Sequence, residues 1–158
     1  MAVLSQLSIP VQPIPISLAT LGVMLIGGLL GCRRGTTALF IYVLMGVCGL
    51  PVFARFNSGI HAITGPTGGF LIGYVIAAAV IGFISERASK ISVFMLGFAA
   101  GAFVYFTAGA IGYGIYMPAS AAEIIEKVVV PFLPGDAIKI IIAALITRRL
   151  RYHLLTCI

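Results

Sequence analysis

The sequence contains no tryptophan, three cysteines, two histidines and only four acidic residues among its 158 residues. Charged residues make up 9% of the chain, against about a quarter in soluble globular proteins, which excludes an ordinary soluble domain. Cys32, Cys48 and Cys157 follow no C-x-x-C spacing, so we expect small apolar side chains rather than a metal or redox site. With so few acids and histidines, no Ser/His/Asp set or metal quartet can be assembled, and we expect neither enzymatic activity nor a cofactor.

Apolar residues, by contrast, account for 61% of the chain. Runs of about 20 apolar residues are long enough to cross a bilayer as helices. Five runs predict spanning helices, at about 16–32, 35–50, 68–84, 91–113 and 135–150. The N-terminal run of residues 1–9 would be only about 13 Å long as a helix, too short for a hydrocarbon core of about 30 Å. Either the natural chain begins further upstream or this helix is a stub; the sequence 1–158 is expected to form a single all-α membrane domain.

The net charge of +6 comes from basic residues in short clusters between apolar runs. Such clusters indicate membrane topology and argue against nucleic acid as a partner. If the Arg33-Arg34 side is cytoplasmic, alternation of the spans puts seven of the ten bases there: Arg33, Arg34, Arg87, Lys90, Arg148, Arg149 and Arg151. The positive-inside rule therefore predicts a multi-pass protein with a cytoplasmic C-terminus and with the connections 51–67 and 114–134 facing outward.

Two opposite charges, Asp136 and Lys139, lie between apolar runs in the segment "PFLPGDAIKIIIAALI". Pro134-Gly135 predicts a turn, which places Asp136 in the first turn of the last helix, where the helix dipole favours an acid. A spacing of three places Lys139 on the same face. The pair is either a capping acid with a helix-surface ion pair, or a ligand site, because ionisable groups within membrane segments are usually functional.

The outward connection contains the segment 65–69, "GPTGG", which we expect to be non-helical. Its glycines would let the backbone approach a ligand or a neighbouring helix closely. No Gly-Lys-Ser/Thr follows at the spacing of a phosphate-binding loop, so ATP hydrolysis by this chain is not expected. Small residues at four-residue spacing, such as Gly27/Gly31 and Gly97/Gly101, predict either packing within the bundle or docking of a separate membrane subunit.

Four blocks of the sequence, "SIPVQPIPISLATLGVMLIGGLLG", "GLPVF", "GPTGGFLIG" and "PFLPGDAIK", together resemble the BioY family. These proteins are the biotin-specific, substrate-binding S components of energy-coupling factor (ECF) transporters. The resemblance covers nearly the whole chain. It implies a bundle of six transmembrane helices, the first truncated here to a stub, in the bacterial cytoplasmic membrane. It also implies an outward-facing pocket that holds biotin as the transported ligand.

The resemblance assigns the ureido ring of biotin to Asp136, Lys139 and Asn57. Their carboxylate, ammonium and amide groups would complement the two N–H donors and the carbonyl of the ring. The ring system and the valeryl chain would pack against apolar side chains. The full set of expected substrate contacts is Asp136, Lys139, Asn57, Phe53, Phe70, Tyr42, Gly68 and Gly69.

The partners implied by the resemblance are biotin, membrane lipid, a transmembrane coupling subunit and two ATPase subunits. Some members of the family are thought to work without this module. Two other functions agree with the residues alone. One is an S component for another small vitamin. The other is a non-transporting assembly subunit, in which the Asp136–Lys139 pair would be purely structural and no saturable ligand would exist.

Overall fold

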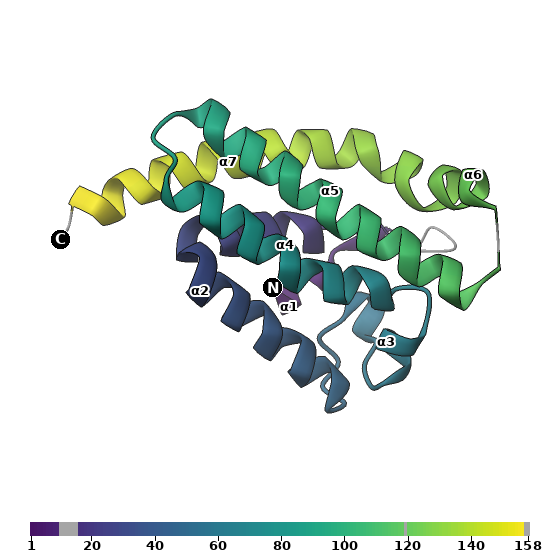
Figure 1. Cartoon of the computed structure of the whole chain (residues 1–158). Helices are drawn as coiled ribbons and strands as arrows, with labels where there is room; N and C mark the ends of the chain where they lie inside the picture. Colours follow the sequence, from purple (N-terminus) through teal and green to yellow (C-terminus); the bar gives the residue numbers. More distant parts are fainter. Residues whose placement is uncertain (10–15, 119, 157–158) are drawn as a thin grey trace.

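The computed structural model describes residues 1–9, 16–118 and 120–156, which form a bundle of helices (Figure 1). The α-helices are α1 (Ala2–Gln6), α2 (Ala19–Val47), α3 (His61–Thr64), α4 (Gly68–Glu86), α5 (Ile91–Tyr116), α6 (Ala121–Ile124) and α7 (Leu133–Thr156). The short helical turns are η1 (Ala54–Phe56), η2 (Ile125–Val129) and η3 (Val130–Phe132). The predicted all-α fold is confirmed apart from one small antiparallel pair, β1 (Ser8–Ile9) with β2 (Ile16–Ser17). Cys157 and residues 10–15 of the first sequence block lie outside the described residues.

Three segments of the described chain are long and apolar enough to cross a membrane: Gly68–Glu86, Ile91–Tyr116 and Ala121–Arg151. Large apolar side chains point outward along them, including Phe103, which is 73% exposed. Such exposure would be costly in water but is expected where lipid surrounds the helices. These features agree with a multi-pass membrane protein.

Helix α2 consists of two helices joined at Gly31. The backbone of Gly31 has φ 79° and ψ −173°, a conformation that glycine adopts without the steric cost of a side chain. A methyl group added to Gly35 would lie 3.2 Å from the Cα of Gly27, whereas residues eight apart in one straight helix are about 12 Å apart. The chain therefore reverses at Gly31, in agreement with the two helices predicted on either side of Arg33-Arg34 (Figure 1).

Helix α4 holds this reversal in place. The Cys32 backbone N–H, near the start of the second half of α2, donates a hydrogen bond of 2.8 Å to a carboxylate oxygen of Glu86. A negative charge at this position is favoured by the dipole of the second half. Gly82 permits the close approach, because a methyl group there would meet backbone atoms of Gly31 and Cys32.

The connections alternate between the two ends of the bundle, as the sequence predicts (Figure 1). The reversal at Gly31, the 87–90 connection and the C-terminal half of α7 lie at one end. The connections 48–67 and 117–132, which contain α3 and α6, lie at the other end. Seven of the ten basic residues therefore belong to the first end. Which end faces the cytoplasm stays a prediction.

Two local predictions are wrong. Pro134-Gly135 is not a turn before the last helix, because α7 begins at Leu133 and contains both residues. Proline is tolerated there because N–H groups in the first helical turn have no partner within the helix. Asp136 does lie in the first turn, as predicted.

The segment 65–69 is also only partly non-helical, because Gly68 and Gly69 begin α4. A methyl group on Gly68 would meet the carbonyl of Ile63, and one on Gly69 would meet the carbonyl of Ala108. These glycines therefore serve close packing of the start of α4 against α3 and α5, and they do not provide an unusual loop conformation.

We expect the substitution Gly82→Ala to lower the free energy of unfolding by about 1–3 kcal/mol, since the added methyl group meets backbone that cannot rotate away. The matched control is Gly135→Ala, because nothing lies within 4 Å of the added group and alanine favours a helix. Thermal unfolding of both variants in detergent, followed by circular dichroism at 222 nm, measures the difference. An unchanged midpoint for Gly82→Ala would contradict the packing described here.

Candidate functional site

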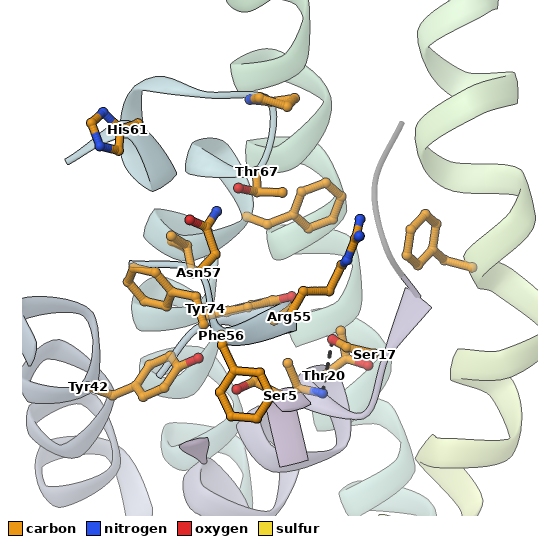
Figure 2. Close-up of a pocket in the computed structure, with 17 residues that line it drawn as sticks. Ser5, Ser17, Thr20, Tyr42, Arg55, Phe56, Asn57, His61, Thr67 and Tyr74 are labelled. Carbon is orange, nitrogen blue, oxygen red and sulfur yellow. Dashed lines mark hydrogen bonds between the residues drawn. The ribbon is translucent and has the colours of Figure 1, made fainter. Parts of the chain in front are cut away.

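A cavity of about 520 Å³ lies toward the end of the bundle that carries the longer connections (Figure 2). Its volume is in the range of small-molecule sites. Its aromatic lining comprises Tyr42, Phe53, Phe56, Phe70, Tyr74 and Phe132. Its polar lining comprises Ser5, Ser17, Thr20, Arg55, Asn57, His61 and Thr67. The cavity thus has apolar walls with a few polar groups, as sites for small organic ligands usually do.

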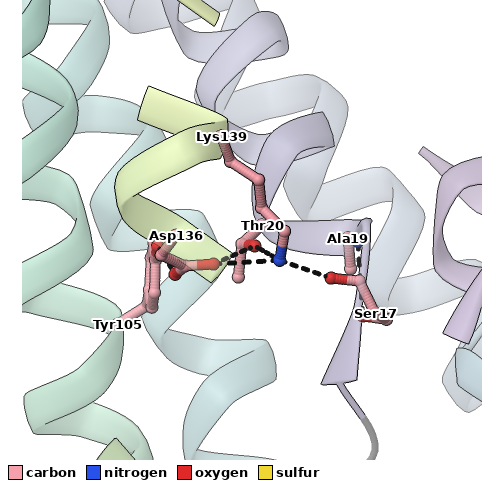
Figure 3. A network of polar contacts seen from close by, with 6 residues as sticks. All are labelled: Ser17, Ala19, Thr20, Tyr105, Asp136 and Lys139. Carbon is pink, nitrogen blue, oxygen red and sulfur yellow. Dashed lines mark hydrogen bonds and ion pairs between the residues drawn. The ribbon is translucent and has the colours of Figure 1, made fainter. Parts of the chain in front are cut away.

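Asp136 and Lys139 form a buried ion pair beside this cavity (Figure 3). The Lys139 Nζ lies 2.9 Å from Asp136 Oδ1, and the two residues are 7% and 2% exposed. Lys139 also donates to the Thr20 hydroxyl at 2.9 Å and to the Ser17 carbonyl at 2.8 Å. All three donors of the ammonium group are therefore used. The interpretation as a helix-surface pair is wrong, because both side chains point into the bundle.

The Asp136 carboxylate is equally well satisfied. Its Oδ1 accepts a hydrogen bond of 3.0 Å from the Thr20 hydroxyl, and its Oδ2 accepts one from the Tyr105 hydroxyl. Tyr105 is fully buried on α5, so the carboxylate joins α5 and α7 to the start of α2. A buried charge is tolerated only when it is paired and hydrogen-bonded in this way.

Thr20 and Ser17 separate the ion pair from the cavity. Both residues line the cavity, and both contact Lys139, while Asp136 and Lys139 are not part of its wall. Thr20 is central, because its hydroxyl donates to Asp136 and accepts from Lys139. The structure thus brings the predicted pair next to the cavity but one residue behind its surface.

Four other residues predicted for the site line the cavity: Tyr42, Phe53, Phe70 and Asn57. The rings of Tyr42 and Phe53 meet edge to face, with centroids 5.6 Å apart. Phe70 packs against Phe132 at a centroid distance of 6.2 Å. Asn57 lies on the exposed connection after η1, and its Oδ1 accepts a hydrogen bond of 2.9 Å from the backbone N–H of Ser58.

The structure does not bring the remaining two predicted residues, Gly68 and Gly69, to the cavity wall. They lie in the contact of α4 with α3 and α5, where they permit close approach of the helices. Their effect on the cavity is indirect, because they set the position of α4, which carries Phe70 and Tyr74.

Sequence reasoning missed the part played by α1. The Gln6 side chain donates to the carbonyls of Pro51 and Phe53, at 3.0 and 2.9 Å, and accepts from the Phe56 N–H at 2.8 Å. The Ser5 hydroxyl also donates to the carbonyl of Val52. The signal was present, because polar side chains in an apolar membrane segment generally have a partner. The long separation along the sequence gave no indication of which partner.

Thr20, Arg55, Tyr74 and Tyr105 were likewise not predicted as site residues. Threonine and tyrosine occur widely in membrane helices, so their types alone did not single them out. Within the described ranges, no group of three or more His, Cys, Asp or Glu residues could hold a metal ion. The site offers a polar end at Ser17 and Thr20, and an aromatic enclosure.

The Tyr105 hydroxyl gives a direct test of the buried network. We expect Tyr105→Phe to lower the free energy of unfolding by about 1–3 kcal/mol, because Asp136 Oδ2 loses a donor in a buried position. Tyr113→Phe is the matched control on the same helix, since that hydroxyl contacts only the Met117 sulfur, at 3.6 Å. Equal thermal midpoints for the two variants would show that the Tyr105 bond contributes nothing.

The sequence has relatives among known proteins. A sequence profile of the BioY family matches residues 1–155. The biotin transporter BioY of Thermotoga maritima is 37% identical over 145 residues, which cover 92% of this chain and 85% of that protein. The biotin transporter BioY of Rhizobium etli is 34% identical, with 94% and 83% of the two chains covered.

The fold also matches that of a protein of known structure. The crystal structure of the S-component for biotin from an ECF-type ABC transporter matches with a TM-score of 0.88 at 30% sequence identity. The match covers 96% of this chain and 84% of that one. The chain therefore belongs to the BioY family.

Proposed function

We propose that this chain binds biotin in the cavity and serves as the biotin-specific S component of an ECF transporter, for uptake across the bacterial cytoplasmic membrane. Residues 1–158 act as a single substrate-binding domain. The observation that carries the proposal is the buried Asp136–Lys139 network, which reaches a 520 Å³ aromatic cavity through Ser17 and Thr20. The relatives named as biotin transporters and the matching biotin S-component support it.

The ureido ring of biotin carries two N–H donors and one carbonyl acceptor, and the polar end of the cavity complements both. Rotation of the Thr20 side chain would open Asp136 Oδ1 and Lys139 Nζ to the cavity. The carboxylate then accepts a ring N–H, and the ammonium donates to the ring carbonyl. The ring would then replace the Thr20 hydroxyl as donor to the carboxylate and as acceptor from the ammonium, so both charges stay hydrogen-bonded.

The apolar part of biotin would pack against Tyr42, Phe53 and Phe70, which enclose the cavity. Burying this surface contributes about 25 cal/mol per Å². Asn57 stays a proposed contact from the loop side of the cavity. Gly68 and Gly69 contribute to the site in this proposal through the packing of α4.

The charge distribution supports an orientation with the C-terminus in the cytoplasm and the cavity facing outward. Membrane lipid would cover the exposed apolar side chains of α4, α5 and α7. The sequence has no phosphate-binding loop, so energy would come from partners: a transmembrane coupling subunit and two ATPase subunits. The S-component match from an ECF-type ABC transporter supports this assembly.

We expect Asp136→Asn to weaken biotin binding by about 10- to 150-fold, the equivalent of one charge-assisted hydrogen bond. The variant also leaves the Lys139 ammonium buried without its counter-ion, which lowers stability. Calorimetry on the detergent-solubilised chain measures the affinity, and thermal unfolding measures the stability.

The double variant Asp136→Asn/Lys139→Met is the matched control, because it removes both charges. A purely structural pair would let this variant recover both stability and biotin binding. The proposal expects recovery of stability without recovery of binding. Wild-type affinity in the double variant would exclude the pair from ligand recognition, whereas an assembly subunit would show no saturable biotin binding in any variant, the wild type included.

Ligand identity is tested by competition. With tritiated biotin bound to the purified chain, we expect excess unlabelled biotin to displace the label, and thiamin and riboflavin at the same excess to leave it bound. The charge-neutral ion pair gives no compensation for the cationic ring of thiamin. The three fused rings of riboflavin are larger than the two fused rings of biotin. Displacement by either other vitamin would point to an S component of different specificity.

A further inference from the structure

The connection that forms one side of the cavity has an unusual backbone. Arg55 and Phe56 have φ values of 61° and 56°, and among the described residues they are the two non-glycine residues with positive φ. Both line the cavity. Left-handed backbone at a non-glycine residue costs free energy, and it persists where surrounding contacts impose it, commonly at ligand clamps.

The surrounding contacts are present and come mostly from α1. Gln6 makes three hydrogen bonds to this connection, to the Pro51 and Phe53 carbonyls and from the Phe56 N–H. The Tyr42 hydroxyl adds a bond of 3.0 Å to the carbonyl of Val52. The backbone at Arg55 is therefore held from both flanks.

This backbone places a permanent cation on the cavity wall. In Figure 2 the Arg55 side chain extends upward, away from Ser17 and Thr20, and its guanidinium lies across the view from Asn57 and below the level of Thr67. Among the described residues, no acid lines the cavity, and the ion pair found is the one between Lys139 and Asp136. The cavity is thus charge-neutral at the Ser17–Thr20 end and positive at the Arg55 end.

We infer that Arg55 determines specificity by binding a carboxylate on the tail of the ligand, and that Gln6 is the positioning residue that holds Arg55 over the cavity. The ligand class is then a monoanionic acid with an uncharged, hydrogen-bonding ring at its other end. Guanidinium groups bind carboxylates through two parallel N–H bonds, and arginine stays charged at every physiological pH. This inference rests on the proposed function and extends it to the tail of the ligand.

The test compares biotin with biotinamide, which has the same ring and an uncharged tail, by calorimetry on the full chain in detergent. We expect the wild type to prefer biotin by about 10- to 150-fold. Arg55→Gln should lose that preference, because biotin binding weakens while biotinamide binding changes by less than about twofold. Arg55→Lys should keep part of the preference, since the charge is retained without the paired N–H geometry.

The matched control is Lys127→Gln, which removes one positive charge from the same end of the bundle at a residue that does not line the cavity. Its preference should equal that of the wild type. Gln6→Ala should weaken the binding of biotin more than the binding of biotinamide, because Arg55 is no longer held in place. The preference for biotin should therefore decrease.

Four results would overturn the inference. Equal wild-type affinities for the two ligands, or an equal loss of both in Arg55→Gln, would do so while leaving the proposed function intact. Loss of the preference in Lys127→Gln would do so as well, because a general charge effect would then explain it. A wild-type chain that binds neither ligand would overturn the proposed function together with the inference.

Discussion

The structure depends on one buried ion pair that must be compensated on every side. Asp136 and Lys139 lie in the first two turns of α7, and their partners come from elsewhere: Tyr105 from α5, Thr20 from α2 and Ser17 from β2. An uncompensated charge at this depth would cost several kcal/mol, so the helices can pack only in the arrangement that completes the network. The pair therefore specifies how three helices meet, and it places polar groups where the cavity ends.

The cavity extends from this network to the connection 48–67 at one end of the bundle. Its Ser17–Thr20 end borders the Asp136–Lys139 pair, which has no net charge and is fully hydrogen-bonded. Its walls are aromatic, and its other end carries Arg55. This gradient suits a ligand that is uncharged and polar at one end, apolar in the middle and anionic at the other. The short helix α1 has a clear place in this arrangement, because Ser5 and Gln6 hold the connection that carries Arg55.

Much of this could be predicted from the sequence. The long apolar runs predicted where the long helices lie, although only three described segments are long and apolar enough to cross a membrane. The positions of the basic clusters predicted which connections share an end. A spacing of three predicted that Asp136 and Lys139 meet, as they do at 2.9 Å. These features are local, since they depend on composition and on helical periodicity. The prediction of a turn at Pro134-Gly135 was wrong, because proline and glycine are also accepted in the first turn of a helix.

The sequence by itself determined a helical membrane protein of the BioY family, with an acid and a base joined on one helical face. Only the tertiary structure decided that these charges lie behind Thr20 and Ser17, that Gly68 and Gly69 pack helices, and that Gln6 binds the connection on either side of Arg55. Thr20 meets Asp136 across 116 positions of the chain, and Gln6 meets Phe56 across 50. No local pattern encodes such partners, because they are selected by the packing of helices and by the need to satisfy every buried polar group at once.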